Sequence, residues 1–269
     1  MSKLSSSHQV VFGALLLAAI FAGPGIARAG SEPGTSSRSP VLVELFTSEG
    51  CSSCPPADRL LQRLDESQPV QNADTIVLSE HVDYWNHDGW RDPYSNAFFT
   101  QRQQLDAARF GLNDVYTPQM VVNGRTQFVG NDSRRATEVI AGSTVVPSPP
   151  MHISPVTVEN GVLKFRVDAN VLAPGGQQPE VLVVLAYERA TSHVTAGENS
   201  GRELTHVAVA HEFTKIGVIP RAGTFSKDVQ LKLGKEWHPG NIRVVAFLQE
   251  PGQGAVLGAA MQRVAEAGK

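Results

Sequence analysis

The stretch from Val41 to Asp58, VLVELFTSEGCSSCPPAD, joins an apolar run to two closely spaced cysteines and to the start of a leucine-rich segment. Residues 41–47 are almost continuously apolar, which is typical of a strand buried on both faces. After Asp58, the leucines at 60, 61 and 64 form a helical stripe. The stretch therefore predicts a strand, a turn that carries both cysteines, and a helix.

Strand and helix patterns continue to alternate up to about residue 144. The dipeptide Asn123-Gly124 between two short apolar runs is a strong signal for a two-residue hairpin. Ser133 is suited to cap a closing helix. This order predicts an α/β fold with a mixed sheet for residues 41–144. We expect strands over 75–79, 119–122 and 126–129, and helices over 96–110 and 133–141.

The pattern changes at residues 145–150, VVPSPP, which are typical of a linker between domains. Beyond them apolar and polar residues alternate in several short runs, and helical periods are scarce. A chain of 269 residues is also longer than one compact domain usually needs. We therefore predict a second domain over 151–269 that is all-β and sandwich-like.

The first 29 residues are typical of a secretion signal. Lys3 supplies a positive charge, residues 10–23 are largely apolar, and Ala27-Arg28-Ala29 is a cleavage motif. The apolar run is shorter than the ~20 residues that a membrane span needs. Residues 30–40, rich in Ser, Gly and Pro, are expected to form a flexible leader. The protein is therefore predicted to be exported, periplasmic or secreted, without membrane contact after cleavage.

Charge narrows the classes of partner. The chain has 23 Lys and Arg against 26 Asp and Glu, which gives a formal net charge of −3. Nucleic-acid-binding domains carry a clustered basic surface instead. We therefore expect no nucleic-acid partner.

Cys51 and Cys54 are the only cysteines of the chain. A disulfide between them closes a loop so short that it stabilises the fold by roughly 2 kcal/mol, against ~4.7 kcal/mol for a hundred-residue loop. Two cysteines alone also fall short of the four ligands of a structural zinc site. Redox chemistry explains this pair best, while a local disulfide staple and a metal site remain alternatives.

A Cys-x-x-Cys pair at the junction of a strand and a helix suits thiol–disulfide exchange. The first thiol lies at the helix N-terminus, where the helix dipole stabilises a thiolate. The second lies one turn later and can attack a mixed disulfide to release the product. Cys51 is thus the expected nucleophile and Cys54 the resolving residue. No cofactor beyond this redox-active disulfide is expected, and the partners would be protein or small thiol and disulfide substrates with an unidentified redox partner.

With these cysteines, Thr117-Pro118 and the Asn123-Gly124 hairpin, residues 41–141 resemble the thioredoxin superfamily. In that superfamily a cis-proline loop faces the dithiol and holds the substrate chain through backbone contacts. The resemblance assigns this position to Pro118, with Thr117 before it. Ser-Ser replaces the Gly-Pro that thioredoxin itself has between its cysteines, so the redox potential of thioredoxin does not transfer.

Three longer runs resemble a narrower family of exported bacterial proteins, catalogued as domain of unknown function 1223. They are VELFTSEGCSSCPPAD from Val43, HVDYWNHDGWRDPYS from His81 and VYTPQMVVNGR from Val115. This resemblance spans the mature chain and implies the fold and an exported location. It lends no activity, because the family has no settled one.

Glu44 interrupts the otherwise apolar first strand. A carboxylate buried beneath the dithiol can take a proton from Cys54 during resolution. Equally, Glu44 can be the partner of a nearby basic side chain such as Arg125. The sequence leaves both interpretations open.

Residues 81–94, HVDYWNHDGWRDPY, gather aromatic and metal-ligating side chains after the second strand. In a thioredoxin-like sheet this segment approaches the cysteines, so Tyr84, Trp85 and Trp90 are candidate residues of a substrate rim. A copper or zinc site is a second interpretation, and a packed loop with neither role is a third. The candidate metal ligands are Cys51, Cys54, His81 and His87.

Residues 195–206, TAGENSGRELTH, form a polar, glycine-punctuated stretch in the second domain. We interpret them as a turn held by Asn and Glu hydrogen bonds, with an interdomain latch or a binding loop as alternatives. The histidines at 193, 206 and 211 are expected to be ordinary strand-edge residues.

The function predicted from these features is that of a thiol–disulfide oxidoreductase outside the cytoplasm. A metal-binding or metallochaperone module is one alternative. The other is a non-catalytic scaffold or partner-binding protein whose disulfide stays closed.

Overall fold

The computed structural model describes residues 38–171, 177–219 and 223–264. The predicted signal segment, 1–29, and most of the predicted leader, 30–40, lie outside the described residues. Among the described residues, no helix is long and apolar enough to cross a membrane. The helices are α1 (Pro55–Ser67), α2 (Ala97–Phe110), α3 (Ser133–Ser143) and the short 3-10 helix η1 (Pro239–Asn241).

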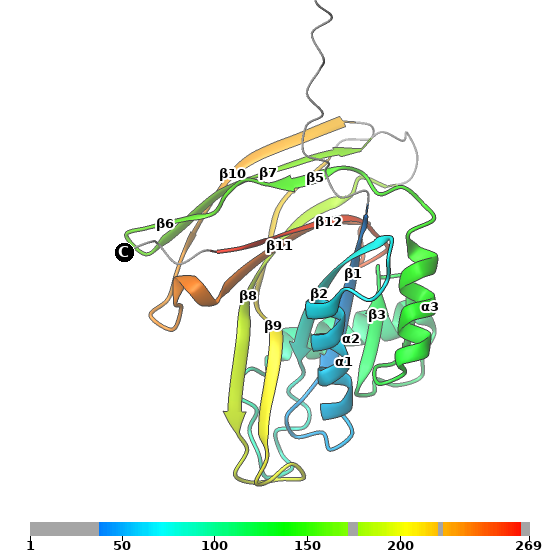
Figure 1. The fold of residues 1–269 in the computed structure, drawn as a ribbon, viewed down its shortest axis with the longest axis vertical. Helices are drawn as coiled ribbons and strands as arrows, with labels where there is room; N and C mark the ends of the chain where they lie inside the picture. The colour runs from blue at the N-terminus through cyan, green and yellow to red at the C-terminus, as the bar shows by residue number, and fades with distance from the viewer. Residues whose placement is uncertain (1–37, 172–176, 220–222, 265–269) are drawn as a thin grey trace, which may run out of the picture. The chain divides into compact units, whose positions relative to one another are not determined.

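The strands form two sheets, which Figure 1 shows together with the helices. The strands are β1 (Ser39–Thr47), β2 (Ala73–His81), β3 (Gln119–Val122), β4 (Thr126–Val129), β5 (Met151–Ile153), β6 (Thr157–Glu159), β7 (Val162–Val171), β8 (Glu180–His193), β9 (Glu203–Val218), β10 (Gly223–Lys232), β11 (Ile242–Gln249) and β12 (Val256–Arg263). The larger sheet has the order β12-β11-β8-β9-β2-β1-β3-β4. The smaller has the order β10-β7-β5, with β6 paired to β7.

The strand predicted from the opening stretch is β1. It is parallel to β2, with Val43 opposite Val77, and antiparallel to β3, with Leu45 opposite Met120. β3 continues into β4 through Asn123-Gly124, whose φ values of 48° and 57° lie in the left-handed region. Asn and Gly adopt that region more readily than other residues, so the hairpin forms where the sequence predicts it.

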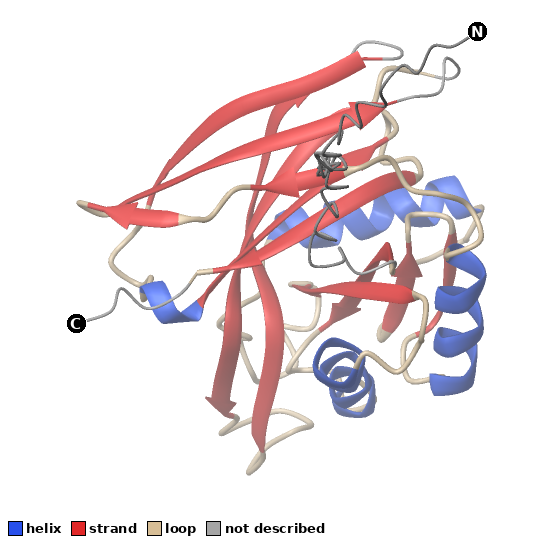
Figure 2. Ribbon diagram, turned by 45° about the horizontal axis from the view of Figure 1, so that its top comes forward, coloured by secondary structure: helices blue, strands red, loops and turns tan. Residues whose placement is uncertain are grey.

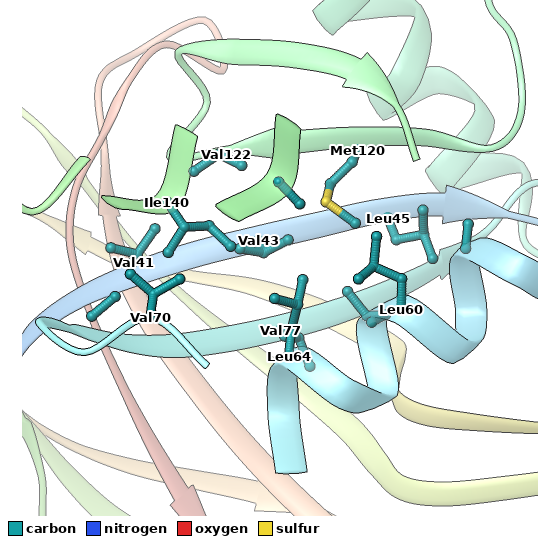
Figure 3. Close-up of a cluster of buried hydrophobic side chains, with 14 of the residues drawn as sticks. Val41, Val43, Leu45, Leu60, Leu64, Val70, Val77, Met120, Val122 and Ile140 are labelled. Atoms are coloured by element: carbon teal, nitrogen blue, oxygen red, sulfur yellow. The ribbon is translucent and has the colours of Figure 1, made fainter. Parts of the chain in front are cut away.

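Helices cover both faces of the sheet around β1, as the blue ribbons of Figure 2 show. Successive side chains of a strand point to opposite faces. Val43 and Leu45 lie on the face that packs against the leucines of α1 and against α3 (Figure 3). Leu42 and Phe46 lie on the other face and pack with Phe99 of α2. The helix that follows the cysteines therefore covers one defined face of β1.

The strands beyond residue 150 join the sheet that precedes them. β9 pairs in parallel with β2, with Val209 opposite Ser79, and Val207 and Ala208 of β9 belong to the same apolar cluster as α1. Without β9, the edge of β2 would present unpaired backbone groups. Residues 145–150 connect α3 to β5. The described residues between 38 and 264 nevertheless form one compact unit, and this differs from the two domains predicted from the sequence.

A third apolar cluster lies between the two sheets. Leu163, Phe165 and Val167 of β7 pack with alternate residues of β8 and β11, such as Val183 and Val244. Period-2 alternation along these strands provides one buried face for each sheet. The strands beyond residue 150 thus belong to two packed sheets, and the larger of these sheets is shared with the first part of the chain.

Candidate functional site

The disulfide lies between the end of β1 and the start of α1. Cys51 and Cys54 are bonded, with their Cα atoms 5.4 Å apart. Cys54 directly precedes α1, and Pro55 and Pro56 fill the first two helical positions. Proline has no backbone N–H, and the first turn of a helix needs none, so the helix can begin directly after the second cysteine. The order of strand, cysteine pair and helix is as the sequence predicts.

Both cysteines are completely buried, at 0% exposure, whereas Ser52 and Ser53 between them are exposed. The Ser53 hydroxyl lies 3.3 Å from Cys51 Sγ, close enough to hydrogen-bond a thiolate at this sulfur. The serines therefore mark the outer surface of the loop, and the two sulfurs face inward.

Trp85 connects the cysteine loop to the loop that precedes β3. A Cβ atom on Gly50 would lie only 2.9 Å from Trp85 Cβ, so the two backbones approach closely here. The indole Nε1 of Trp85 donates a hydrogen bond to Thr117 Oγ1 at 2.8 Å, and the Thr117–Pro118 peptide bond is cis. The structure thus places Trp85, Thr117 and Pro118 in one chain of contacts with the residue next to Cys51.

The other two predicted rim residues differ in position. Trp90 Nε1 donates to Glu49 Oε2 at 2.8 Å, two residues before Cys51. Tyr84 instead donates through its hydroxyl to Gln103 Oε1 of α2 at 3.1 Å. Trp85 and Trp90 therefore contact the segment that leads into the disulfide, and the hydroxyl of Tyr84 turns toward α2.

A buried group of titratable side chains lies beside the cysteine loop. His206 of β9 lies between two carboxylates, with Nε2 3.2 Å from Glu49 Oε1 and Nδ1 3.8 Å from Asp58 Oδ1. The ring of His81 meets that of His206 edge-on, and its Nδ1 lies 2.7 Å from Asp92 Oδ2. All five side chains are almost fully buried.

The two carboxylates set the charge of His206. Burial by itself lowers the pKa of this imidazole, but the contacts with the Asp58 and Glu49 carboxylates outweigh burial and raise the pKa to about 10. His206 is therefore an imidazolium at neutral pH. It links β9 to both the cysteine loop and α1, which the expectation of an ordinary strand-edge histidine missed.

The tip of the β8–β9 hairpin also contacts the cysteine loop. The Asn199 amide group donates to the carbonyl oxygens of Glu49, at 2.8 Å, and Cys51, at 3.0 Å. The neighbouring Glu198 accepts the backbone N–H of Ser52 through Oε2 at 3.1 Å. The stretch that we interpreted as a self-contained turn thus binds a loop almost 150 residues earlier in the chain.

Glu44 is directed away from the disulfide. Its side chain lies on the α2 face of β1, opposite the α1 face, and it forms an ion pair with Arg102 of α2. Burial raises the pKa of neighbouring Glu80 well above its usual range, and burial with the Glu44 charge raises that of Asp106 to about 6. The structure therefore gives Glu44 a basic partner, Arg102 in place of the suggested Arg125, and does not bring it to Cys54.

Comparison with known proteins identifies the family. Residues 42–249 match the family model described as "Protein of unknown function (DUF1223)". The chain belongs to the DUF1223 family. No curated protein matches it.

Two solved structures share the fold of this DUF1223 chain. The crystal structure of protein AGR_C_4864 from Agrobacterium tumefaciens matches with a TM-score of 0.67 at 24% identity, over 87% of this chain and 99% of that one. HBP35 of Porphyromonas gingivalis matches with a TM-score of 0.62 at 15% identity, over 86% of this chain and 76% of that one. At these identities the likeness extends to the fold alone.

The predicted metal ligands of the DUF1223 chain do not come together. His87 is exposed and lies 3.4 Å from Asp88, whereas His81 is buried against Asp92. Within the described residues, no group of three or more His, Cys, Asp or Glu side chains is arranged to hold a metal ion. The four candidate ligands are therefore divided between a disulfide, a surface loop and a buried contact between His81 and Asp92.

Asp58, Asn199 and His206 are among the residues of this site that sequence reasoning missed. Asp58 had a local signal, because a residue four positions after Cys54 lies on the same side of a helix. Asn199 and His206 had none, since their contacts depend on how β9 pairs with β2.

Proposed function

We propose that this DUF1223 protein is a thiol–disulfide oxidoreductase that acts outside the cytoplasm through Cys51 and Cys54. The observation that carries the proposal is the disulfide between residues three apart at the N-terminus of α1. A loop this short contributes little to stability, so a structural role gives a weak reason for the bond. Reversible exchange gives a strong one.

The strands and helices around the cysteines support a thioredoxin-like arrangement for residues 41–144. β1 lies between parallel β2 and antiparallel β3, with α1 and α3 over one face and α2 over the other. The cis Thr117–Pro118 bond precedes β3, and Trp85 links Thr117 to the cysteine loop. In the proposal these two residues position the backbone of the substrate.

In the exchange reaction, two substrate thiols are oxidised to a disulfide while the Cys51–Cys54 disulfide is reduced to two thiols. A substrate thiolate attacks Cys51 Sγ, the Cys51–Cys54 bond breaks, and Cys54 leaves as a thiolate that takes up a proton. A second substrate thiol then attacks the mixed disulfide, which releases the substrate disulfide and Cys51. Two electrons pass from the substrate to the protein, and the reverse sequence reduces a disulfide.

Asp58 takes the proton-transfer role in place of Glu44. It is buried on α1 one turn after Cys54, and its backbone N–H donates to the Cys54 carbonyl at 3.1 Å. Thr47 and His206 hold its carboxylate, with the Thr47 hydroxyl 2.9 Å from Oδ1. In the proposal, this carboxylate exchanges a proton with Cys54 as the thiol forms or attacks.

The burial of both cysteines favours one alternative, a scaffold whose disulfide stays closed. Trapping of a mixed disulfide distinguishes the exchange function from the closed scaffold. With Cys54→Ser, a reduced Cys51 that attacks a disulfide-containing polypeptide cannot be resolved, so a mixed disulfide should accumulate and be visible by non-reducing electrophoresis. Cys51→Ser is the matched control and should trap at least tenfold less. A closed scaffold would trap nothing with either variant.

A further inference from the structure

The tip of the β8–β9 hairpin, residues 194–202, lies against the cysteine loop and is held to the backbone of this loop by the side chains of Glu198 and Asn199. We infer that Glu198 and Asn199 select the substrate of the dithiol: they close it to small thiols and admit a polypeptide whose flanking residues displace the tip. This inference rests on the proposed exchange function. It assigns part of the β-rich half of the chain to the reaction.

Asn199 is the main attachment of the tip. Its side chain is completely buried, and its amide group bridges two carbonyl oxygens of the cysteine loop, those of Glu49 and Cys51. The Asn199 amide oxygen in turn accepts a hydrogen bond from Arg202 at 2.9 Å. The nitrogen of this amide thus donates to two carbonyl oxygens and its oxygen accepts from Arg202, which fixes the tip on the loop.

Glu198 is the second attachment and lies at the surface. Its carboxylate accepts the N–H of Ser52, the residue between Cys51 and the exposed Ser53. The hydrogen bonds from Ser52 lower the pKa of Glu198, so the carboxylate is ionised at neutral pH. It therefore places a hydrogen-bond acceptor and a negative charge directly beside the disulfide.

The tip has a defined conformation that fits this position. Val194 and Arg202 pair at its base, with the Val194 N–H donating to the Arg202 carbonyl at 2.9 Å. Gly197 has a φ of +71°, and a Cβ there would lie 3.1 Å from both the Asp88 carbonyl oxygen and Trp90 Cβ. Both the positive φ and the close packing against the loop that carries Trp90 therefore favour glycine at this position.

Covering the sulfurs has a kinetic consequence. Exchange requires in-line approach of a thiolate to sulfur, and neither cysteine has any exposed surface in this structure. Most residues of the tip are exposed, and three hydrogen bonds attach the tip to the cysteine loop. Its displacement is therefore the step that precedes attack on Cys51.

A polypeptide substrate can offset the cost of this displacement and a small thiol cannot. Residues on either side of a substrate cysteine can pack on Trp85 and Trp90, which are only partly buried beside the tip. A backbone carbonyl of the substrate can also replace Glu198 as the acceptor for the Ser52 N–H. A single thiol-bearing residue has neither contact.

The test compares two neutral thiols of the same chemistry. One is N-acetylcysteine amide, and the other is the same cysteine at the centre of an uncharged nine-residue peptide. The second-order rate constant for reduction of the Cys51–Cys54 bond is measured by acid quench, alkylation and mass spectrometry. The variants are Asn199→Ala and Glu198→Gln, with Glu203→Gln as control, because Glu203 pairs with His193 on the same hairpin.

In the unsubstituted protein the peptide should react at least tenfold faster than the amide. Asn199→Ala should raise the rate constant for N-acetylcysteine amide at least tenfold and so reduce the ratio between the rate constants of the two thiols. Glu198→Gln should raise the rate constant for N-acetylcysteine amide severalfold. Glu203→Gln should leave the rate constants of both thiols unchanged. Equal rates for the two thiols in the unsubstituted protein would overturn the inference. So would an unchanged amide rate in Glu198→Gln, whose exposed side chain makes it the safer variant for folding.

These rates do not depend on the proposed activity, because any accessible disulfide is reduced by thiols. If Cys54→Ser traps no polypeptide while Asn199→Ala still speeds reduction by N-acetylcysteine amide, the proposed function is wrong and the inference about the tip is retained. If Cys54→Ser traps a polypeptide and the rate constants do not change in the tip variants, the inference about the tip is wrong and the proposed function is retained.

Discussion

At the scale of single residues, His206 determines the charge balance beside the disulfide. Its imidazolium lies between the Glu49 and Asp58 carboxylates and faces the rings of His81 and Tyr94. A free histidine has a pKa of about 6.5, whereas that of folded His206 is about 10. Because the folded value is raised, the stabilisation is complete below pH ~6.5 and is lost as the pH rises toward 10.

We predict that the free energy of unfolding falls by on the order of a few kcal/mol between pH 6.5 and 10. His206→Gln should flatten this slope and lower stability at pH 7 by about 3–5 kcal/mol, since two buried carboxylates lose their cation. Urea unfolding at a series of pH values measures both effects. An equal slope in the variant and the unsubstituted protein would show that His206 is not the titrating group.

At the scale of elements, Trp85 holds together the cysteine loop and the loops that precede α2 and β3. Gly50 permits this, because a Cβ there would lie 2.9 Å from Trp85 Cβ and 3.2 Å from the Trp85 carbonyl oxygen. Its φ is not positive, so the restriction is purely steric. The close approach of two backbones, rather than a turn conformation, requires glycine at this position.

Gly50→Ala should therefore displace Trp85 and weaken its hydrogen bond to Thr117. We predict a loss of about 1–3 kcal/mol in the free energy of unfolding, as for other overpacked sites, together with slower exchange with polypeptide substrates. Gly142→Ala in α3 is the matched control, since a Cβ at Gly142 meets no atom within 4 Å. If Gly50→Ala behaves like this control, the Trp85 contact does not organise the site.

The pieces of the site that depend on local sequence could be predicted, and the long-range contacts could not. Three local signals each specify the structure of the residues around them. They are the apolar run before Cys51, the two prolines after Cys54 and the Asn123-Gly124 hairpin. The role of Glu44 stayed open because alternation along β1 does not reveal which face α1 covers. Asn199 contacts the cysteine loop only because β9 pairs with β2, and no pattern within either strand specifies that pairing.

At the scale of the whole molecule, a buried ion network joins the helical and β-rich parts. Arg243 of β11 is completely buried and donates to both oxygens of Asp65 in α1, each at 2.8 Å, and to Glu188 of β8. Arg263 of β12 contacts the same two carboxylates. The network and the continuous sheet make α1 depend on strands that lie almost 180 residues later.

Arg243→Met should destabilise the entire chain by about 3–5 kcal/mol, because it leaves the buried Asp65 carboxylate short of a partner. The α-helices of the described residues all precede residue 144, so their unfolding can be followed by circular dichroism at 222 nm. We predict a lower denaturation midpoint for this helical signal. An unchanged helical midpoint would indicate two parts that unfold independently.

The most direct test of the proposed exchange activity is the reduction potential of the Cys51–Cys54 pair in the full chain. It is obtained by equilibration with glutathione from the oxidised and the reduced side until both agree, with alkylation as the readout. We predict a value between about −120 and −270 mV, the range of dedicated exchange catalysts. A value well below about −300 mV, as structural disulfides have, would contradict an exchange function.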